Sequence, residues 1–175
     1  MENNDRDYRL KFVGLKEGKH HFEYKIDKTF FEEFNYDEFQ NADIEVNVVL
    51  TKKNTHLELD ISNKGTINVS CDLTLEHFDL PINNAVSLVV KFGAQFEEVD
   101  ENLITIPTGS HEIDIQQYIY ECIVLGIPQK KIHPGVADGT LDSEILDKLN
   151  DLKANKNIEE NNETDPRWDK LKELL

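Results

Sequence analysis

The chain has 175 residues, 38% of them hydrophobic, which suits one domain, or one domain plus a tail, with a real core. Its net charge of −16 excludes a surface that coats RNA, and we expect no DNA partner, because phosphate backbones attract basic proteins. No apolar run approaches the roughly eighteen residues of a membrane helix, and the N-terminus lacks a signal-peptide pattern, so we expect a cytoplasmic protein without a membrane partner.

Period-2 alternation of apolar residues dominates the first two-thirds of the chain and predicts an antiparallel β-meander. Asp27 can cap a short helix that runs through Phe34. Turns are expected at Lys53-Asn54 and at Asn63-Lys64-Gly65, and Pro81 is expected to interrupt the pattern. The predicted strands cover residues 9–15, 20–26, 43–52, 55–61, 66–71, 85–96 and 103–106.

The apolar period then changes, which predicts one long helix over residues 113–125, stopped by Gly126 and Pro128. A second helix is expected over residues 141–152. The predicted fold class is therefore α+β: an antiparallel sheet, open or partly closed into a barrel, with one long helix packed on it and helical C-terminal elements.

The domain organisation follows from composition. Residues 1–152 are predicted to form a single α+β domain, and residues 153–163 a flexible acidic linker. Residues 164–175 are predicted to form a short helix with Pro166 at its first position. Such a helix is marginal alone in water, and it carries the chain's only tryptophan. We therefore expect the tail to dock on the domain or on a partner, and we favour the partner.

No catalytic motif is present in the sequence. We find no Ser-His-Asp order, no nucleophile elbow and no glycine-rich phosphate loop. Cys71 and Cys122 are predicted to be buried thiols, and the histidines to be solvated or locally hydrogen-bonded. We expect no enzymatic activity, no metal and no cofactor; a metal-dependent hydrolase is the weakest alternative.

Two segments are candidates for partner recognition. Residues 128–134 form a basic island in an acidic protein, suited either to an acidic or phosphate group or to the dipole of the preceding helix. The second candidate is the tail, whose apolar stripe could enter a groove of a partner. The predicted partner-binding residues are Pro128, Lys130, Lys131, His133, Pro134, Asp165, Pro166, Arg167, Trp168 and Leu171.

Five features follow one another along the chain: the cysteine ending the strand at 66–71, the apolar strand at 86–96, the helix at 113–125, the Ile127-Pro128…His133-Pro134 turn and the 165–168 tail. In these features and their order the chain resembles the YceD-like family of bacterial and plastid proteins. The family is linked to accumulation of large-subunit ribosomal RNA. The resemblance implies a non-enzymatic ribosome-biogenesis factor that supports 23S rRNA accumulation through a ribosomal or ribosome-assembly protein.

At one place the chain departs from the pattern of the family that it resembles. Many members carry a Cys-x-x-Cys pair here, with further cysteines towards the C-terminus, which suggests a zinc site. In this chain Thr74 stands at the second position of that pair. The departure implies that packing of Leu73, Leu75 and Phe78 holds the loop.

An alternative function follows from charge. Residues 72–121 contain ten acidic residues and one lysine, a local charge of −9. This stretch suits an acidic adaptor or chaperone for a basic ribosomal protein. Direct contact with RNA and the oligomeric state are left open by the sequence.

Overall fold

The structure is a computed structural model that describes residues 7–141 and 143–154. In chain order the elements are β1 (Arg9–Lys11), β2 (Gly18–Asp27), α1 (Lys28–Glu32), β3 (Asn41–Lys52), β4 (His56–Ser70), β5 (His77–Gly93), β6 (Glu97–Asp100), β7 (Leu103–Pro107), β8 (Glu112–Asp114), α2 (Gln116–Leu125), α3 (Pro134–Ala137) and α4 (Glu144–Ala154).

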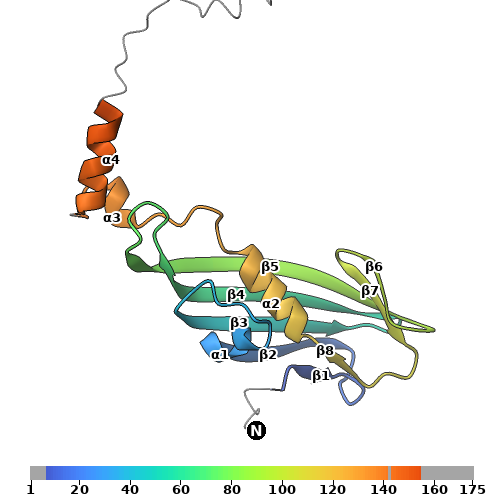
Figure 1. Cartoon of the computed structure of the whole chain (residues 1–175). Helices are drawn as coiled ribbons and strands as arrows, with labels where there is room; N and C mark the ends of the chain where they lie inside the picture. The colour runs from blue at the N-terminus through green and yellow to red at the C-terminus, as the bar shows by residue number, and fades with distance from the viewer. Residues whose placement is uncertain (1–6, 142, 155–175) are drawn as a thin grey trace, which may run out of the picture.

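Six strands form one open, twisted sheet in the order β2-β3-β4-β5-β7-β6 (Figure 1). Strands β2 to β5 are consecutive antiparallel neighbours, which confirms the predicted meander. Strand β7 pairs in parallel with the end of β5, so the sheet is mixed rather than wholly antiparallel. Because β2 and β6 are its two edges within the described residues, the sheet does not close into a barrel there.

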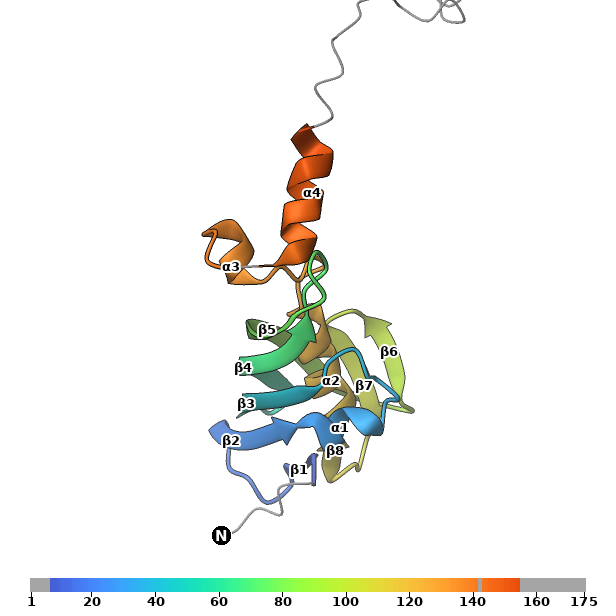
Figure 2. The same cartoon turned by 60° about the vertical axis from the view of Figure 1, so that its left-hand side comes forward.

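The period-2 pattern divides the sheet into two faces. In β3 the buried side chains alternate with exposed ones, and the same alternation runs through β4. Helices α1 and α2 lie on the buried face, and Figure 2 shows no helix over the opposite face of β2–β5. The core therefore lies between the sheet and these two helices. Its largest fully buried side chains include Phe31, Ile44, Leu50, Leu59, Ile61, Ile104 and Ile119.

The predicted turn at Asn63-Lys64-Gly65 is wrong, because β4 runs straight through it for 15 residues. Gly65 is paired with Ile44 of β3. A Cβ on Gly65 would lie 2.2 Å from the Asp43 carbonyl oxygen. The glycine thus allows two strands to approach closely instead of forming a turn.

Pro81 does not interrupt the next strand as predicted, because β5 spans 17 residues and includes it. Pro81 is exposed and lies opposite Thr66. On its other side no described segment pairs with β5 at this point, since β7 pairs only with the last five residues, from Val89. A missing N–H is tolerated where a strand forms an edge.

The N-terminal strand and the start of the long helix also differ from expectation. Strand β1 pairs with β8, with Leu10 opposite Ile113, instead of with the following strand. Ile113 and Ile115 are both buried, so alternation with a period of two continues to that point. The predicted long helix is therefore wrong in length, since α2 has ten residues and begins at Gln116.

Helix α2 is held against β4 and β5 by polar as well as apolar contacts. The Asn84 side chain donates to the Cys122 carbonyl at 2.9 Å. Asn63, which is 2% exposed, donates to the Cys122 sulfur at 3.1 Å. Gly126 caps the helix, as predicted, and a Cβ there would lie 2.9 Å from Cβ of Asn84. These contacts fix the helix over the centre of the sheet.

Candidate functional site

The turn at residues 128–134 is joined to the loop at residues 71–76, between β4 and β5. The Asp72 N–H donates to the Lys131 carbonyl at 2.8 Å, and the Lys131 N–H donates to Asp72 Oδ2 at 2.7 Å. This reciprocal pair resembles the bonding between two strands, and it ties segments that are far apart in sequence. We call these two segments the paired loops.

Cys71 lies at the centre of the paired loops and is fully buried. The His133 N–H donates to its sulfur at 3.3 Å. Burial raises the pKa of the Cys71 thiol, but hydrogen bonds from the His133 N–H and the Thr74 hydroxyl outweigh burial and lower the pKa below its usual value. Both predictions of a buried thiol are confirmed, since Cys122 is also buried and free.

The residues at the family's zinc pattern do not fit a structural zinc ion. Such an ion takes four thiolate or imidazole ligands. Thr74 replaces the second thiolate, is 2% exposed, and hydrogen-bonds the Cys71 sulfur. The loop is also closed by two backbone bonds, from Leu75 N–H to the Cys71 carbonyl at 2.9 Å and from Cys71 N–H to the Glu76 carbonyl at 2.8 Å. Hydrogen bonds therefore hold the loop in this chain.

The prediction that Leu73 and Leu75 hold this loop by packing is wrong. Leu75 is 71% exposed and has a φ of 63°, a left-handed conformation that is unusual for leucine. Leu73 and Ile132 are each 41% exposed. Only Phe78 is buried as expected, with its ring 5.3 Å from the His133 ring. The paired loops thus expose three large apolar side chains. The sequence predicts that Leu73 and Leu75 are packed, and it gives no prediction for Ile132.

The predicted partner-binding residues of the turn fall into two groups. Lys131 is mostly covered, and its Nζ lies 3.5 Å from Glu38 Oε2. His133 accepts the Gly135 N–H at 3.0 Å through Nδ1 and so caps α3. Of the predicted partner-binding residues in the turn, Pro128, Lys130 and Pro134 are exposed. The predicted tail residues lie outside the described residues: Asp165, Pro166, Arg167, Trp168 and Leu171.

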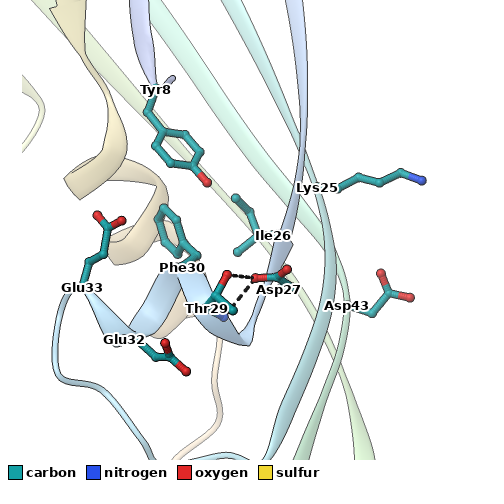
Figure 3. A pocket seen from close by; sticks show the side chains of 9 residues that line it. All are labelled: Tyr8, Lys25, Ile26, Asp27, Thr29, Phe30, Glu32, Glu33 and Asp43. Atoms are coloured by element: carbon teal, nitrogen blue, oxygen red, sulfur yellow. Dashed lines mark hydrogen bonds between the residues drawn. The ribbon is translucent and has the colours of Figure 1, made fainter. Parts of the chain in front are cut away.

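A hollow of about 950 Å³ lies around the end of β2 and the start of α1 (Figure 3). Asp27 Oδ1 accepts the Thr29 N–H at 2.9 Å and caps α1, which confirms the predicted cap. Figure 3 shows Lys25 and Asp43 pointing away from Tyr8. Lys25 and Asp43 therefore do not face Tyr8 across this hollow, and none of the predicted partner residues that the structure describes lines it.

Residues 7–141 and 143–154 contain neither a candidate metal centre nor a membrane-crossing helix. No group of three or more His, Cys, Asp or Glu side chains there could hold a metal ion. No helix in the same residues has the length and apolar character needed to cross a membrane.

Comparison with known proteins gives one family match. The family described as large ribosomal RNA subunit accumulation protein YceD matches residues 59–175, about two-thirds of the chain. The matched region begins within β4 and contains the paired loops, α2 and the C-terminal tail. No curated protein and no solved structure matches the chain. The predicted resemblance is thus confirmed, and the chain belongs to the YceD family, whose name connects it with accumulation of large-subunit ribosomal RNA.

Proposed function

We propose that this protein is a non-enzymatic ribosome-biogenesis factor of the cytoplasm. It supports 23S rRNA accumulation by contacting a ribosomal or ribosome-assembly protein, rather than by acting on the RNA chemically. Membership of the YceD family supports the link to large-subunit rRNA. The net charge of −16 favours a protein partner over the RNA itself.

The observation that carries this proposal is the construction of the paired loops. Hydrogen bonds between Asp72 and Lys131 fix the two segments relative to each other. On this frame, Leu73, Leu75 and Ile132 remain exposed instead of entering the core. Apolar side chains on a rigid frame lose little conformational entropy when a partner covers them, so such a surface favours binding.

The tail is proposed as a second contact with the same partner. Its sequence places Trp168 and Leu171 on one side of a short helix that follows an acidic linker. A linker of this length reaches roughly 20 Å as a flexible coil, so the tail and the paired loops could engage neighbouring sites together. Two weak contacts that are linked in this way bind much more tightly than either alone.

Sedimentation of a native lysate on a sucrose gradient tests the association with the ribosome. We expect the protein to co-migrate with large-subunit precursors and to move to the top of the gradient in high salt. If the protein stays at the top even in low salt, the proposed biogenesis role is wrong.

Three variants test the proposed surfaces in the same gradient. We expect Leu75→Ser to weaken co-migration, because it removes the most exposed of the three apolar side chains without opening the core. Deletion of residues 165–175 should leave the domain folded and also reduce co-migration. The matched control is Val13→Ser, which changes another strongly exposed apolar side chain, 62% exposed, away from the paired loops. Equal behaviour of Leu75→Ser and the control would contradict the role of the paired loops.

A second candidate function is an acidic adaptor or chaperone for a basic ribosomal protein. The observation that favours it is β6, where Glu97, Glu98 and Asp100 are all exposed at the edge of the sheet. Such a complex should weaken steeply between low and high salt, because screening shortens the reach of surface charges. A salt-independent affinity for ribosomal proteins would contradict this function.

A further inference from the structure

A groove of about 630 Å³ lies between α2 and the β6–β7 hairpin, which lie near each other in Figure 2. Its floor is apolar and comes from Val86 and Leu88 of β5 and Ile104 of β7. Tyr118 and Leu125 of α2 form part of one wall, and the β6–β7 hairpin forms the other. None of the described residues that line it comes from the paired loops.

The charged side chains of this groove are all acidic. Glu121 comes from α2, and Glu98, Asp100 and Glu101 come from the hairpin. Among the residues that the structure describes, no lysine, arginine or histidine lines the groove. Within the described part of the chain, none of these four carboxylates forms an ion pair. The groove therefore concentrates negative charge beside an apolar floor.

The acidic lining continues along α2 into a second hollow of about 470 Å³, which shares Glu98 and Tyr118 with the groove. This hollow adds Glu33 and Asp114, and the residues of 7–141 and 143–154 that line it include no basic side chain. We call the groove and this hollow together the acidic track.

Large apolar side chains are exposed along the acidic track. Leu125 is 73% exposed at one end, and Phe96 is 56% exposed at the other. Val99 is 54% exposed and lies at the irregularity where β6 loses its register with β7. Exposed apolar groups between unpaired charges are typical of a surface that a partner covers.

The charge of the acidic track decides which occupant fits. Nucleic acid is repelled by four carboxylates without counter-charges. A second copy of this chain would place the same carboxylates opposite each other across a two-fold axis. A basic segment, by contrast, supplies the missing opposite charges, and apolar side chains in that segment can cover Val99 and Leu125.

We propose that the acidic track binds a basic, amphipathic segment of a partner protein, with lysine or arginine side chains at Glu98 and Glu121 and apolar side chains over Val99 and Leu125. This inference rests on the proposed action through protein partners, but it names a surface separate from the paired loops and the tail. The partner's chemistry is that of a cationic protein extension.

Tyr118 offers a spectroscopic readout at this surface, because it lies between the two parts of the acidic track. Burial raises the pKa of its hydroxyl, and the negative charges of Glu98, Glu121 and Asp114 raise it further. A cationic ligand in the track offsets these charges, so binding should lower the pKa of Tyr118. A tyrosinate titration followed by absorbance, with an arginine-leucine peptide that keeps its charge at this pH and with Tyr118→Phe as the reference, measures this change.

The binding experiment uses the purified full-length chain and a fluorescent synthetic peptide of lysine and leucine in an amphipathic pattern. Two control peptides replace all lysines by glutamate or all leucines by serine. We expect the first peptide to bind, with an affinity that falls as salt increases, and both controls to bind at least tenfold more weakly. Failure of the lysine-leucine peptide to bind at low salt would overturn the inference.

Variants then locate the bound peptide on the protein. We expect the double variant Glu98→Gln/Glu121→Gln to weaken binding roughly five- to tenfold, and Leu125→Ser to weaken it severalfold. The matched control is Glu23→Gln/Glu45→Gln, which removes the same net charge from exposed positions on the opposite face of the sheet. Equal weakening in both double variants would show attraction by net charge alone and would refute a specific site.

The same preparation tests the two other occupants. A chain without residues 164–175 that binds the peptide tenfold more tightly would assign the acidic track to the protein's own tail. A fall in sedimentation coefficient in Leu125→Ser would assign it to a second copy, because this change removes an exposed apolar contact without relieving charge repulsion. Because purified components are used, these outcomes do not depend on whether the protein associates with ribosomal precursors.

Discussion

Replacing Gly65 by alanine tests how closely β3 and β4 approach each other at the centre of the sheet. In the register of these strands Gly65 lies opposite Ile44. An added Cβ would lie 2.2 Å from the Asp43 carbonyl oxygen and 2.6 Å from the Ile44 Cα. Both are backbone atoms of a central strand, so no side-chain rotation can relieve the overlap.

The cost of Gly65→Ala follows from this overlap. The strands must separate locally by roughly 1 Å to restore ordinary contact distances. Overpacking of a core site costs about 1–3 kcal/mol, and a weakened interstrand hydrogen bond adds about 0.5–1.5 kcal/mol. We therefore expect the free energy of unfolding to fall by about 2–4 kcal/mol, and the Tm by roughly 5–15 °C for a chain of this size.

Urea unfolding followed by circular dichroism measures this change. The matched control is Gly14→Ala, because a Cβ on Gly14 meets no atom within 4 Å. The control should be neutral or more stable by about 0.4–1 kcal/mol, since alanine restricts the unfolded chain. If Gly65→Ala is within about 0.5 kcal/mol of the unchanged protein, the close approach is wrong and the turn predicted at residues 63–65 is favoured again.

The remaining predictions concern a buried amide, a buried phenol and the paired loops. Asn63 is buried and donates to the Cys122 sulfur at 3.1 Å, so Asn63→Ala should lower the free energy of unfolding by about 1–2 kcal/mol through the lost hydrogen bond and the space left behind; an unchanged value in urea unfolding would contradict this. Burial raises the pKa of Tyr24 from 10.0 to about 12. The neutral hydroxyl therefore contributes fully to the free energy of unfolding below pH 10.0, and this contribution is lost as the pH rises through about 12. The free energy of unfolding of Tyr24→Phe should therefore fall less steeply over that range, and parallel pH profiles would refute the assignment. Asp72→Ala removes the acceptor of the Lys131 N–H, so hydrogen exchange of that amide should accelerate about tenfold, and unchanged exchange would show that the turn is held by other contacts.

Several features of the fold could be predicted because they depend on neighbouring residues in the chain. Alternation along residues 43–52 and 55–61 predicts both the strands and the faces that they bury, since successive side chains of a strand point to opposite sides. The Asp27 cap and the helix stop at Gly126 are also local, because each involves atoms within a few residues. The family could also be predicted from the sequence, because the resemblance depends on the order of features along the chain and not on how they pack.

The pairing of the strands could be established only from the structure, because alternation of apolar residues with a period of two does not show which two segments are neighbours. The pairing of β1 with β8 and of β5 with β7 joins segments that local patterns cannot connect. The residue types of Gly65 and Pro81 predict chain breaks. In the folded sheet the close approach of β3 requires Gly65, and the edge formed by this part of β5 tolerates Pro81, so both lie within strands.

The two candidate surfaces arise from the same kind of long-range packing. Leu73 and Leu75 look like core residues in sequence, and only the closure of their loop by hydrogen bonds leaves them exposed. Glu98 and Glu121 are 23 positions apart, and they line one groove because the β6–β7 hairpin packs beside α2. Composition reveals how much acidic charge residues 72–121 carry, but the position of that charge on the surface depends on how distant elements pack together.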